Sequence, residues 1–150
     1  MSEPRWIWQC DRVIPSQVGA GRKVRREVLQ QLQKEDWEER DMHGVQLALE
    51  EALVNAIKHG NGLDEKKHVQ IRCQMSEELI RIEVVDEGEG FDPHRLPDPT
   101  DLENREIPNG RGVLLMRRFM DRVEYNDKGN RVLLEKHRSG AVDHSASSIR

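Results

Sequence analysis

The chain has 150 residues and a mass of 17.5 kDa, which predicts one domain built around a single hydrophobic core. Charged residues make up 35% of it and the net charge is -4, so nucleic acid is not expected as a partner. No apolar run approaches the roughly 18 residues that span a bilayer, and the N-terminus lacks the apolar stretch of a signal peptide, so we expect a cytoplasmic protein with no membrane partner.

The N-terminal part is predicted to form a strand and then a helix. Residues 6–13, WIWQCDRV, are rich in aromatic and β-branched side chains, which favour a strand. Ser16 is the expected N-cap of a helix that runs to about Glu35. The basic cluster RKVRRE at 22–27 lies on this helix and forms either a solvated face or a surface that binds a partner.

The two cysteines are expected to be buried free thiols. Cys10 and Cys73 lie far apart in sequence within predicted strands, and no C-x-x-C motif occurs. The six histidines show no ligand spacing with cysteine or carboxylate, which argues against a zinc site.

A second helix is predicted from about Arg40 to His59, with Gly60-Asn61-Gly62 as a left-handed cap. Within this apolar helix Glu51 and Asn55 are four residues apart and therefore share a face. A buried carboxylate without a partner would be costly or take up a proton. Either this face lines a cleft that holds water or a cation, or a nearby arginine pairs with Glu51.

Two alternating segments, 69–75 and 79–86, predict a β-hairpin with one covered face. The alternation places Asp86 on the covered side at the end of the second strand. Gly88 and Gly90 follow in DEGEGF and let the backbone turn sharply and approach a ligand, although a simple tight loop explains them equally well.

Residues 92–110, DPHRLPDPTDLENREIPNG, contain four prolines and no sustained period, which indicates a functional lid or a disordered segment. A third helix is predicted from about Arg111 to Met120. Gly110 and Gly112 stand at its start, where free backbone N-H groups and the helix dipole favour a phosphate, and Arg111 adds a positive charge. A helix that merely begins after a flexible loop is the alternative.

The remaining chain predicts a second hairpin, formed by residues 122–126 and 131–137, and a disordered tail at 138–150. The order β, α, α, β, β, α, β, β predicts an α+β fold, a two-layer α/β sandwich with three helices on one face of a mixed, mostly antiparallel sheet of about five strands. Residues 1–137 would form the single domain.

Taken together, the acid and amide on a helix, the D-x-G-x-G after a strand, the long lid and the G-x-G that opens a helix resemble the N, G1 and G2 boxes of the GHKL ATPase superfamily. The resemblance covers about residues 10–136 and implies the Bergerat ATP-binding fold. The forms EALVNAIKHGN and GRGVLLMRRFMDRV look most like the anti-sigma factor serine kinases of bacterial partner-switching systems.

The resemblance implies a role for each motif. Glu51 would be the general base and Asn55 would hold Mg²⁺, which prefers few protein oxygens together with phosphates and water. Asp86 would bind the adenine amino group, and Gly88 and Gly90 would let the nucleotide lie close.

The resemblance also assigns the phosphate site and marks one departure. Gly110 and Gly112, with the amides that follow them up to Val113, would cradle the phosphates of ATP under the lid at 92–109. Lys58 and His59 are weaker candidates for phosphate contact. Related kinases can carry a lid arginine before these glycines, where this chain has Pro108-Asn109, and Arg111 or Arg105 would have to replace it.

The function that the resemblance implies is an ATP-dependent serine protein kinase that phosphorylates a small antagonist protein and sequesters a sigma factor. A nucleotide-dependent partner-binding module with little kinase activity is the alternative. The detached catalytic domain of a histidine kinase ranks last, because no helix offers a phosphoacceptor histidine with a dimerisation hairpin. Homodimers are common in the family.

Overall fold

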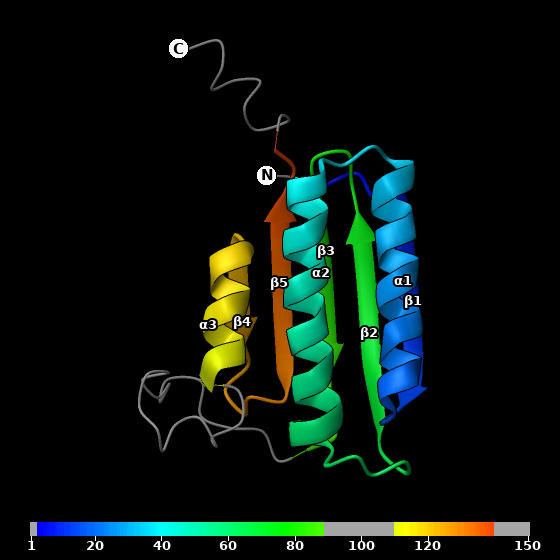
Figure 1. Cartoon of the computed structure of the whole chain (residues 1–150), viewed down its shortest axis with the longest axis vertical. Helices are drawn as coiled ribbons and strands as arrows, with labels where there is room; N and C mark the ends of the chain where they lie inside the picture. Colours follow the sequence, from blue (N-terminus) through cyan, green and yellow to red (C-terminus); the bar gives the residue numbers. More distant parts are fainter. Residues whose placement is uncertain (1–2, 89–109, 140–150) are drawn as a thin grey trace.

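The computed structural model describes residues 3–88 and 110–139, which form two layers (Figure 1). One layer is a sheet with the strand order β1-β2-β3-β5-β4, in which every neighbouring pair is antiparallel. The strands are β1 (Trp8–Pro15), β2 (His68–Met75), β3 (Leu79–Val85), β4 (Arg122–Tyr125) and β5 (Arg131–His137).

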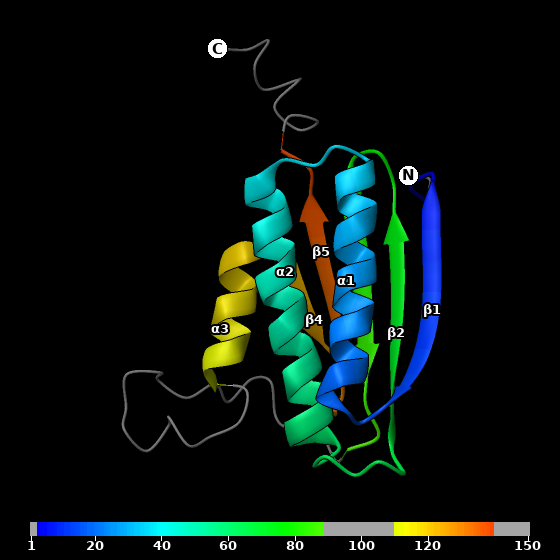
Figure 2. The same ribbon diagram turned by 45° about the vertical axis from the view of Figure 1, so that its right-hand side comes forward.

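The other layer contains α1 (Val18–Lys34), α2 (Glu39–Val54) continued by η1 (Asn55–Gly60), and α3 (Gly110–Phe119). These helices cover one face of the sheet, with α2 in the middle (Figures 1 and 2). The predicted α+β two-layer sandwich is confirmed. The sheet is antiparallel throughout rather than mixed, because β5 lies between β3 and β4 and runs antiparallel to both.

Alternating side chains explain why β2 and β3 form the middle of the sheet. On β2 the odd-numbered residues from Val69 to Met75 are buried, and on β3 Ile80, Ile82 and Val84 are buried. Their polar alternates form the open face, where Arg81 pairs with Glu135 at 2.8 Å. The sheet therefore has one apolar face for the helices and one charged face for water.

The core lies between the two layers. Helix α1 contributes Val24, Val28 and Leu32, and the middle of α2 contributes Val45 and Leu49, all at most 4% exposed. These residues recur every three or four positions, so each helix turns one apolar stripe toward the sheet.

Ser16 is not an N-cap, which corrects the expectation. Gln17 takes that position without a side-chain cap. The buried Ser16 hydroxyl instead donates to Lys67 O at 2.8 Å and accepts from Asn61 Nδ2 at 3.0 Å. A buried hydroxyl must be hydrogen-bonded, and here partners distant in sequence replace the local N-H groups.

The second helix changes its pitch, which the sequence pattern did not predict. Regular α-helix ends at Val54, and η1 continues as a six-residue π-helix. The left-handed cap comes from Gly62, with φ 61°, and Leu63, with φ 60°. A π-helical turn is rare and often occurs at functional sites.

Some predictions lie outside the described residues: Gly90, the lid at 92–109 with Arg105 and Pro108-Asn109, and the tail beyond Ser139. Arg138 and Ser139, at the start of that tail, are hydrogen-bonded to the end of α1 and to α2. Within residues 3–88 and 110–139, no helix is long and apolar enough to cross a membrane.

Candidate functional site

Three segments meet at the end of the sandwich where η1 ends and α3 begins (Figure 1). Glu51 lies in the last turn of α2, Asn55 begins η1, and Gly112 lies in the first turn of α3. A Cβ atom on Gly112 would lie 2.8 Å from Glu51 Oε2 and 3.1 Å from Asn55 Nδ2. The start of α3 therefore packs against the polar face of α2 and η1, and the absence of a side chain at Gly112 allows this close approach.

The Glu51 carboxylate is partly buried and has no ion-pair partner among the described side chains. Burial raises its pKa, and the negative charge of Glu50 adds to the rise. The alternative of a nearby arginine finds no support in the part of the chain that the structure describes. A carboxylate with a raised pKa is better matched to accept a proton near neutral pH.

Asn55 lies partly buried beside Tyr125 of β4, and its amide acts on the tyrosine hydroxyl through a side-chain hydrogen bond. The Nδ2 atom of this amide is buried. The amide lies close to Tyr125 on β4, whose pKa burial raises to about 12 while the amide works against the rise.

Asp86 follows β3 and is held by its backbone and one carboxylate oxygen. Its N-H donates to Asn130 O at 2.9 Å, and its Oδ1 accepts from the Gly88 N-H at 2.8 Å. Burial raises the pKa of Asp86, opposed by the Gly88 hydrogen bond and by the charges of Lys128 and Lys67. Among the described residues, no hydrogen bond to the second oxygen, Oδ2, is found.

The predicted direction of Asp86 is confirmed, because it faces the helix layer at the end of η1. A Cβ on Gly60 would lie 2.4 Å from Asp86 Cγ, and one on Gly88 would lie 2.0 Å from Gly60 O. Neither position can carry a side chain without moving backbone or carboxylate. The two glycines thus let Asp86 pack against the helix end.

Asn61 and Tyr125 are site residues that sequence reasoning missed. Asn61 is 2% exposed; its Nδ2 donates to Ser16 Oγ and to His68 O, and its Oδ1 accepts from the Glu87 N-H at 2.8 Å. It therefore ties the end of η1 to the loop that carries Asp86. In the sequence, Asn61 lies between Gly60 and Gly62, which indicated only a helix cap. Its other role was missed because Ser16 and Glu87 are distant in sequence.

Tyr125 connects the two halves of the site. Both Asp86 and Glu51 raise its pKa through their charges, so its hydroxyl lies within electrostatic reach of both carboxylates. Its only sequence signal is that it is the single tyrosine of the chain.

The remaining predicted residues divide into three groups. Val113 is fully buried in the core, so only its backbone amide could meet a phosphate. Lys58 and His59 are exposed; Lys58 lines a groove between α1 and α2, and partial burial lowers the pKa of His59. Gly110 and Arg111 open α3, and Gly90 lies outside the described residues.

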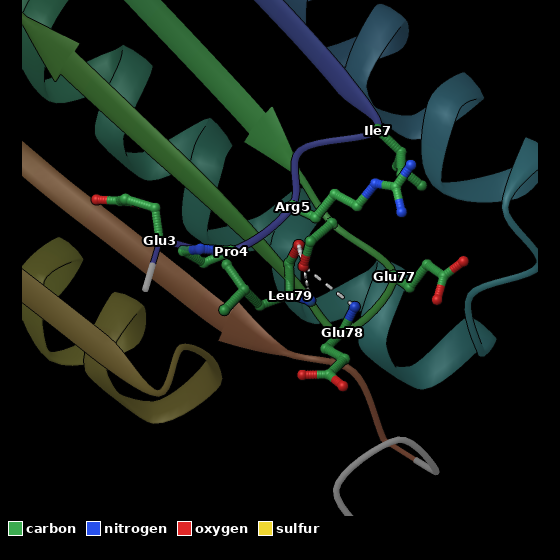
Figure 3. Close-up of a pocket in the computed structure, with 8 residues that line it drawn as sticks. Glu3, Pro4, Arg5, Ile7, Glu77, Glu78 and Leu79 are labelled. Carbon is green, nitrogen blue, oxygen red and sulfur yellow. Dashed lines mark hydrogen bonds between the residues drawn. The ribbon is translucent and has the colours of Figure 1, made fainter. Parts of the chain in front are cut away.

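A separate pocket lies at the other end of the molecule. The N-terminal segment and the turn between β2 and β3 line it, and Figure 3 shows Pro4 and Arg5 beside Glu78 of that turn and Leu79 at the start of β3. None of the predicted site residues reaches it.

The site fits a nucleotide with Mg²⁺ better than a metal held by protein alone. Among the described side chains, no three of the His, Cys, Asp and Glu type come together as a metal site. Mg²⁺ in nucleotide sites keeps waters and phosphate oxygens and needs few protein ligands. Of the residues gathered here, Glu51 and Asn55 carry side-chain oxygens, the donors that Mg²⁺ takes, and the start of α3 lies close to both.

Known proteins are similar to this chain in sequence and in fold. Residues 14–136 match the family model described as a histidine kinase-like ATPase domain. The chain is 33% identical to the anti-sigma F factor of Clostridium perfringens (strain ATCC 13124) over 101 residues, 64% of this chain and 72% of that protein. It is 30% identical to the serine-protein kinase RsbW of Bacillus subtilis (strain 168) over 115 residues, 71% of this chain and 72% of that protein.

A solved structure has the same fold. The crystal structure of the RsbU and RsbW domains of Rv1364c from Mycobacterium tuberculosis superposes with a TM-score of 0.60 at 14% identity over 87% of this chain. The match spans 32% of that longer chain. The chain therefore belongs to the histidine kinase-like ATPase (GHKL) family, which implies that it binds ATP, and within that family it is similar to anti-sigma factors and serine-protein kinases.

Proposed function

We propose that this protein is an ATP-dependent serine kinase and anti-sigma factor of the cytoplasm, which phosphorylates a small antagonist protein and sequesters a sigma factor. The names of two relatives, an anti-sigma F factor and a serine-protein kinase, support the two halves of this proposal. The observation that carries it is the packing of Gly112 against Glu51 and Asn55. That contact sets a proton acceptor beside a helix N-terminus that can bind phosphates.

Glu51 is proposed as the general base. Its carboxylate would accept the proton of the serine hydroxyl as the oxygen attacks the terminal phosphate of ATP. Its raised pKa and the lack of an ion-pair partner among the described residues favour this role. Asn55 would hold Mg²⁺ through its amide oxygen, and bound Mg²⁺ supplies neutralisation of the phosphate charge.

Asp86 is proposed to read the base of the nucleotide. Oδ2 would accept a hydrogen bond from the adenine amino group, while Oδ1 stays engaged with the Gly88 N-H. The amides of Gly110, Gly112 and Val113 would bind the phosphates, with residues 92–109 as the lid.

Incubation of the protein with Mg-ATP and its cognate antagonist, followed by mass spectrometry for phosphoserine, tests this function. Replacing Glu51 by alanine should slow phosphorylation by about 10²- to 10⁴-fold, the usual share of a general base. ATP affinity, measured by calorimetry, should stay close to that of the wild type. Lost nucleotide affinity with unchanged turnover would refute the role of Glu51.

A nucleotide-dependent binding module with little kinase activity is the second candidate. It is favoured by Pro108-Asn109, which stands where related kinases can carry an arginine. In that case the wild type would bind Mg-ATP and the antagonist but leave the antagonist unmodified. Phosphohistidine in the target would instead indicate the catalytic domain of a histidine kinase.

The partners follow from the same proposal. We expect one complex with a sigma factor and one with the antagonist, and a homodimer is compatible with both. A pull-down from the native cytoplasm with ATP present should recover these proteins, and recovery that does not depend on ATP would weaken the assignment.

A further inference from the structure

Cys10 and Cys73 form a pair that the proposed function does not use. Both are free and buried, as expected from the sequence, with exposed fractions of 8% and 0%. They lie directly opposite each other in the register of β1 and β2, so both side chains are on the core face of the sheet. Residues 63 positions apart in sequence are thus cross-strand neighbours.

The hydrogen-bond pattern of the sheet indicates how far apart they are. Ser76 N donates to Leu79 O at 2.9 Å, so every second residue of β2, counted back from Ser76, bonds its backbone to β3. Cys73 falls between these residues and directs its backbone groups to β1, where Cys10 is its partner. The Cα atoms of such a hydrogen-bonded pair are about 5.5 Å apart, within the roughly 4.4–6.8 Å that a disulfide spans.

The two thiols already interact and are not equivalent. The hydrogen bond between them lowers the pKa of Cys10 and raises that of Cys73, whose burial adds to the rise. Near Cys10, Arg12 and Glu27 form an ion pair and act on that thiol in opposite directions. Cys10 is therefore the better nucleophile, because the thiolate is the reactive form.

Cys10 is also the more accessible of the two. Among the described strands, β1 is at the edge of the sheet and pairs with β2 alone. An edge strand separates from its neighbour at lower cost than a central strand, which admits a small oxidant.

We propose that Cys10 and Cys73 are a redox modification site, which a peroxide converts reversibly into a cross-strand disulfide. The Cys10 thiolate attacks one oxygen of hydrogen peroxide, the O-O bond breaks, and the other oxygen leaves as hydroxide, so Cys10 becomes a sulfenic acid. The sulfur of Cys73 then attacks that sulfur, the S-O bond breaks, and the hydroxyl leaves as water with the proton of the Cys73 thiol. Two thiols are oxidised and one peroxide is reduced.

The disulfide would tie the edge strand to the sheet across a loop that contains α1, α2 and η1. Closing a loop of this length restricts the unfolded chain, so the oxidised form should melt on the order of 10 °C higher than the reduced form. Ser16, just beyond β1, is bonded to Asn61 at the nucleotide site, so oxidation would also stiffen one support of that site.

The test treats the full-length protein with hydrogen peroxide, unfolds it, alkylates all remaining thiols and measures the intact mass. We expect a monomer that has lost two hydrogen masses and takes up no alkylating agent, a Cys10–Cys73 peptide on digestion, and return of both thiols with dithiothreitol. Two thiols still open to alkylation would overturn the proposal. So would a stable sulfinic acid on Cys10 or a disulfide between two molecules.

Cys10→Ala is the matched control, since it keeps Cys73 and cannot form the bond. After the same treatment it should keep one alkylatable thiol, and its melting temperature should be unchanged by peroxide. If Cys10→Ala fails to fold, the wild-type experiment still tests the proposal. Its alkylation is done on unfolded protein, in which every thiol that has not been oxidised reacts. A rise in the melting temperature of Cys10→Ala equal to that of the wild type would overturn the proposed link.

Discussion

At the end of the sandwich where α2 begins, Asp41 is 1% exposed and both of its carboxylate oxygens are engaged. It accepts hydrogen bonds from the backbone N-H and the hydroxyl of Ser139, each at 2.8 Å. At the opposite end Glu51 and Asp86 are only partly buried, and burial raises the pKa of both. Glu51 has no ion-pair partner among the described side chains.

The two ends therefore use carboxylates for different purposes. A buried carboxylate with two donors contributes to stability because its charge is compensated in the folded state. A carboxylate left partly desolvated costs stability and is retained where a ligand or a proton completes it. The amide of Asn61, by comparison, is engaged through both its nitrogen and its oxygen.

The largest expected effect is on nucleotide binding through Asp86. Asp86→Asn keeps an oxygen for the Gly88 N-H but loses the charge, so ATP affinity should fall about 100-fold, the loss expected for a charged hydrogen bond. Calorimetric titration with Mg-ATP measures this. If the variant kept the wild-type affinity for ATP and the same preference for ATP over GTP, Asp86 would not be a nucleotide-binding residue.

At the other end, Asp41→Ala should lower stability and leave nucleotide binding alone. It leaves two donors of Ser139 without their acceptor, which should cost about 2 kcal/mol of unfolding free energy, measured with urea. Ser139→Ala, which keeps the backbone N-H bond, should cost about 1 kcal/mol. If Asp41→Ala also weakened ATP binding, the two ends would not be independent.

Gly112→Ala should separate activity from stability. The new Cβ would displace the flexible end of Glu51, so phosphorylation should fall about 10-fold. Alanine in place of glycine in a helix adds about 0.5–1 kcal/mol of stability, which the displacement of Glu51 and Asn55 partly offsets. Gly19→Ala on α1 is the matched control, because nothing lies within 4 Å of its Cβ. Gly19→Ala should gain the whole of that helical stability and keep full activity. Equal rates of phosphorylation in the two variants would mean that residue 112 does not contact Glu51.

The smallest expected effect is the pH dependence of stability at Glu51. Its pKa is raised above the ordinary 4.5 in the folded state, so the folded protein binds this proton more tightly than the unfolded chain. The contribution of Glu51 to the free energy of unfolding therefore falls as the pH rises above 4.5. Glu51→Gln should stabilise the protein at neutral pH by on the order of a few tenths of a kcal/mol, since water still screens the group.

Urea unfolding at about pH 5 and about pH 8 measures that slope. The difference between wild type and Glu51→Gln should be larger at the higher pH. A variant less stable than the wild type at the higher pH would mean that Glu51 is satisfied in the folded protein.

Much of this fold could be predicted from residue patterns. The alternation in β2 and β3 predicted the hairpin and the inward direction of Asp86, which its contact with Gly60 confirms. The π-helical turn at Asn55–Gly60 could not be predicted, because π and α turns use the same residue types and differ in packing. Ser16 was assigned to the wrong role since its partners, Lys67 and Asn61, are distant in sequence.

The sequence by itself determined which residue types can do chemistry here and on which element each stands, because helical and strand periods are local properties of the chain. Only the tertiary structure decided that Gly112 meets Glu51, that Gly60 meets Asp86, and that Cys10 faces Cys73. Each of these contacts joins segments far apart in sequence. Their distances depend on how the layers pack and on the register of the strands, which no local pattern encodes.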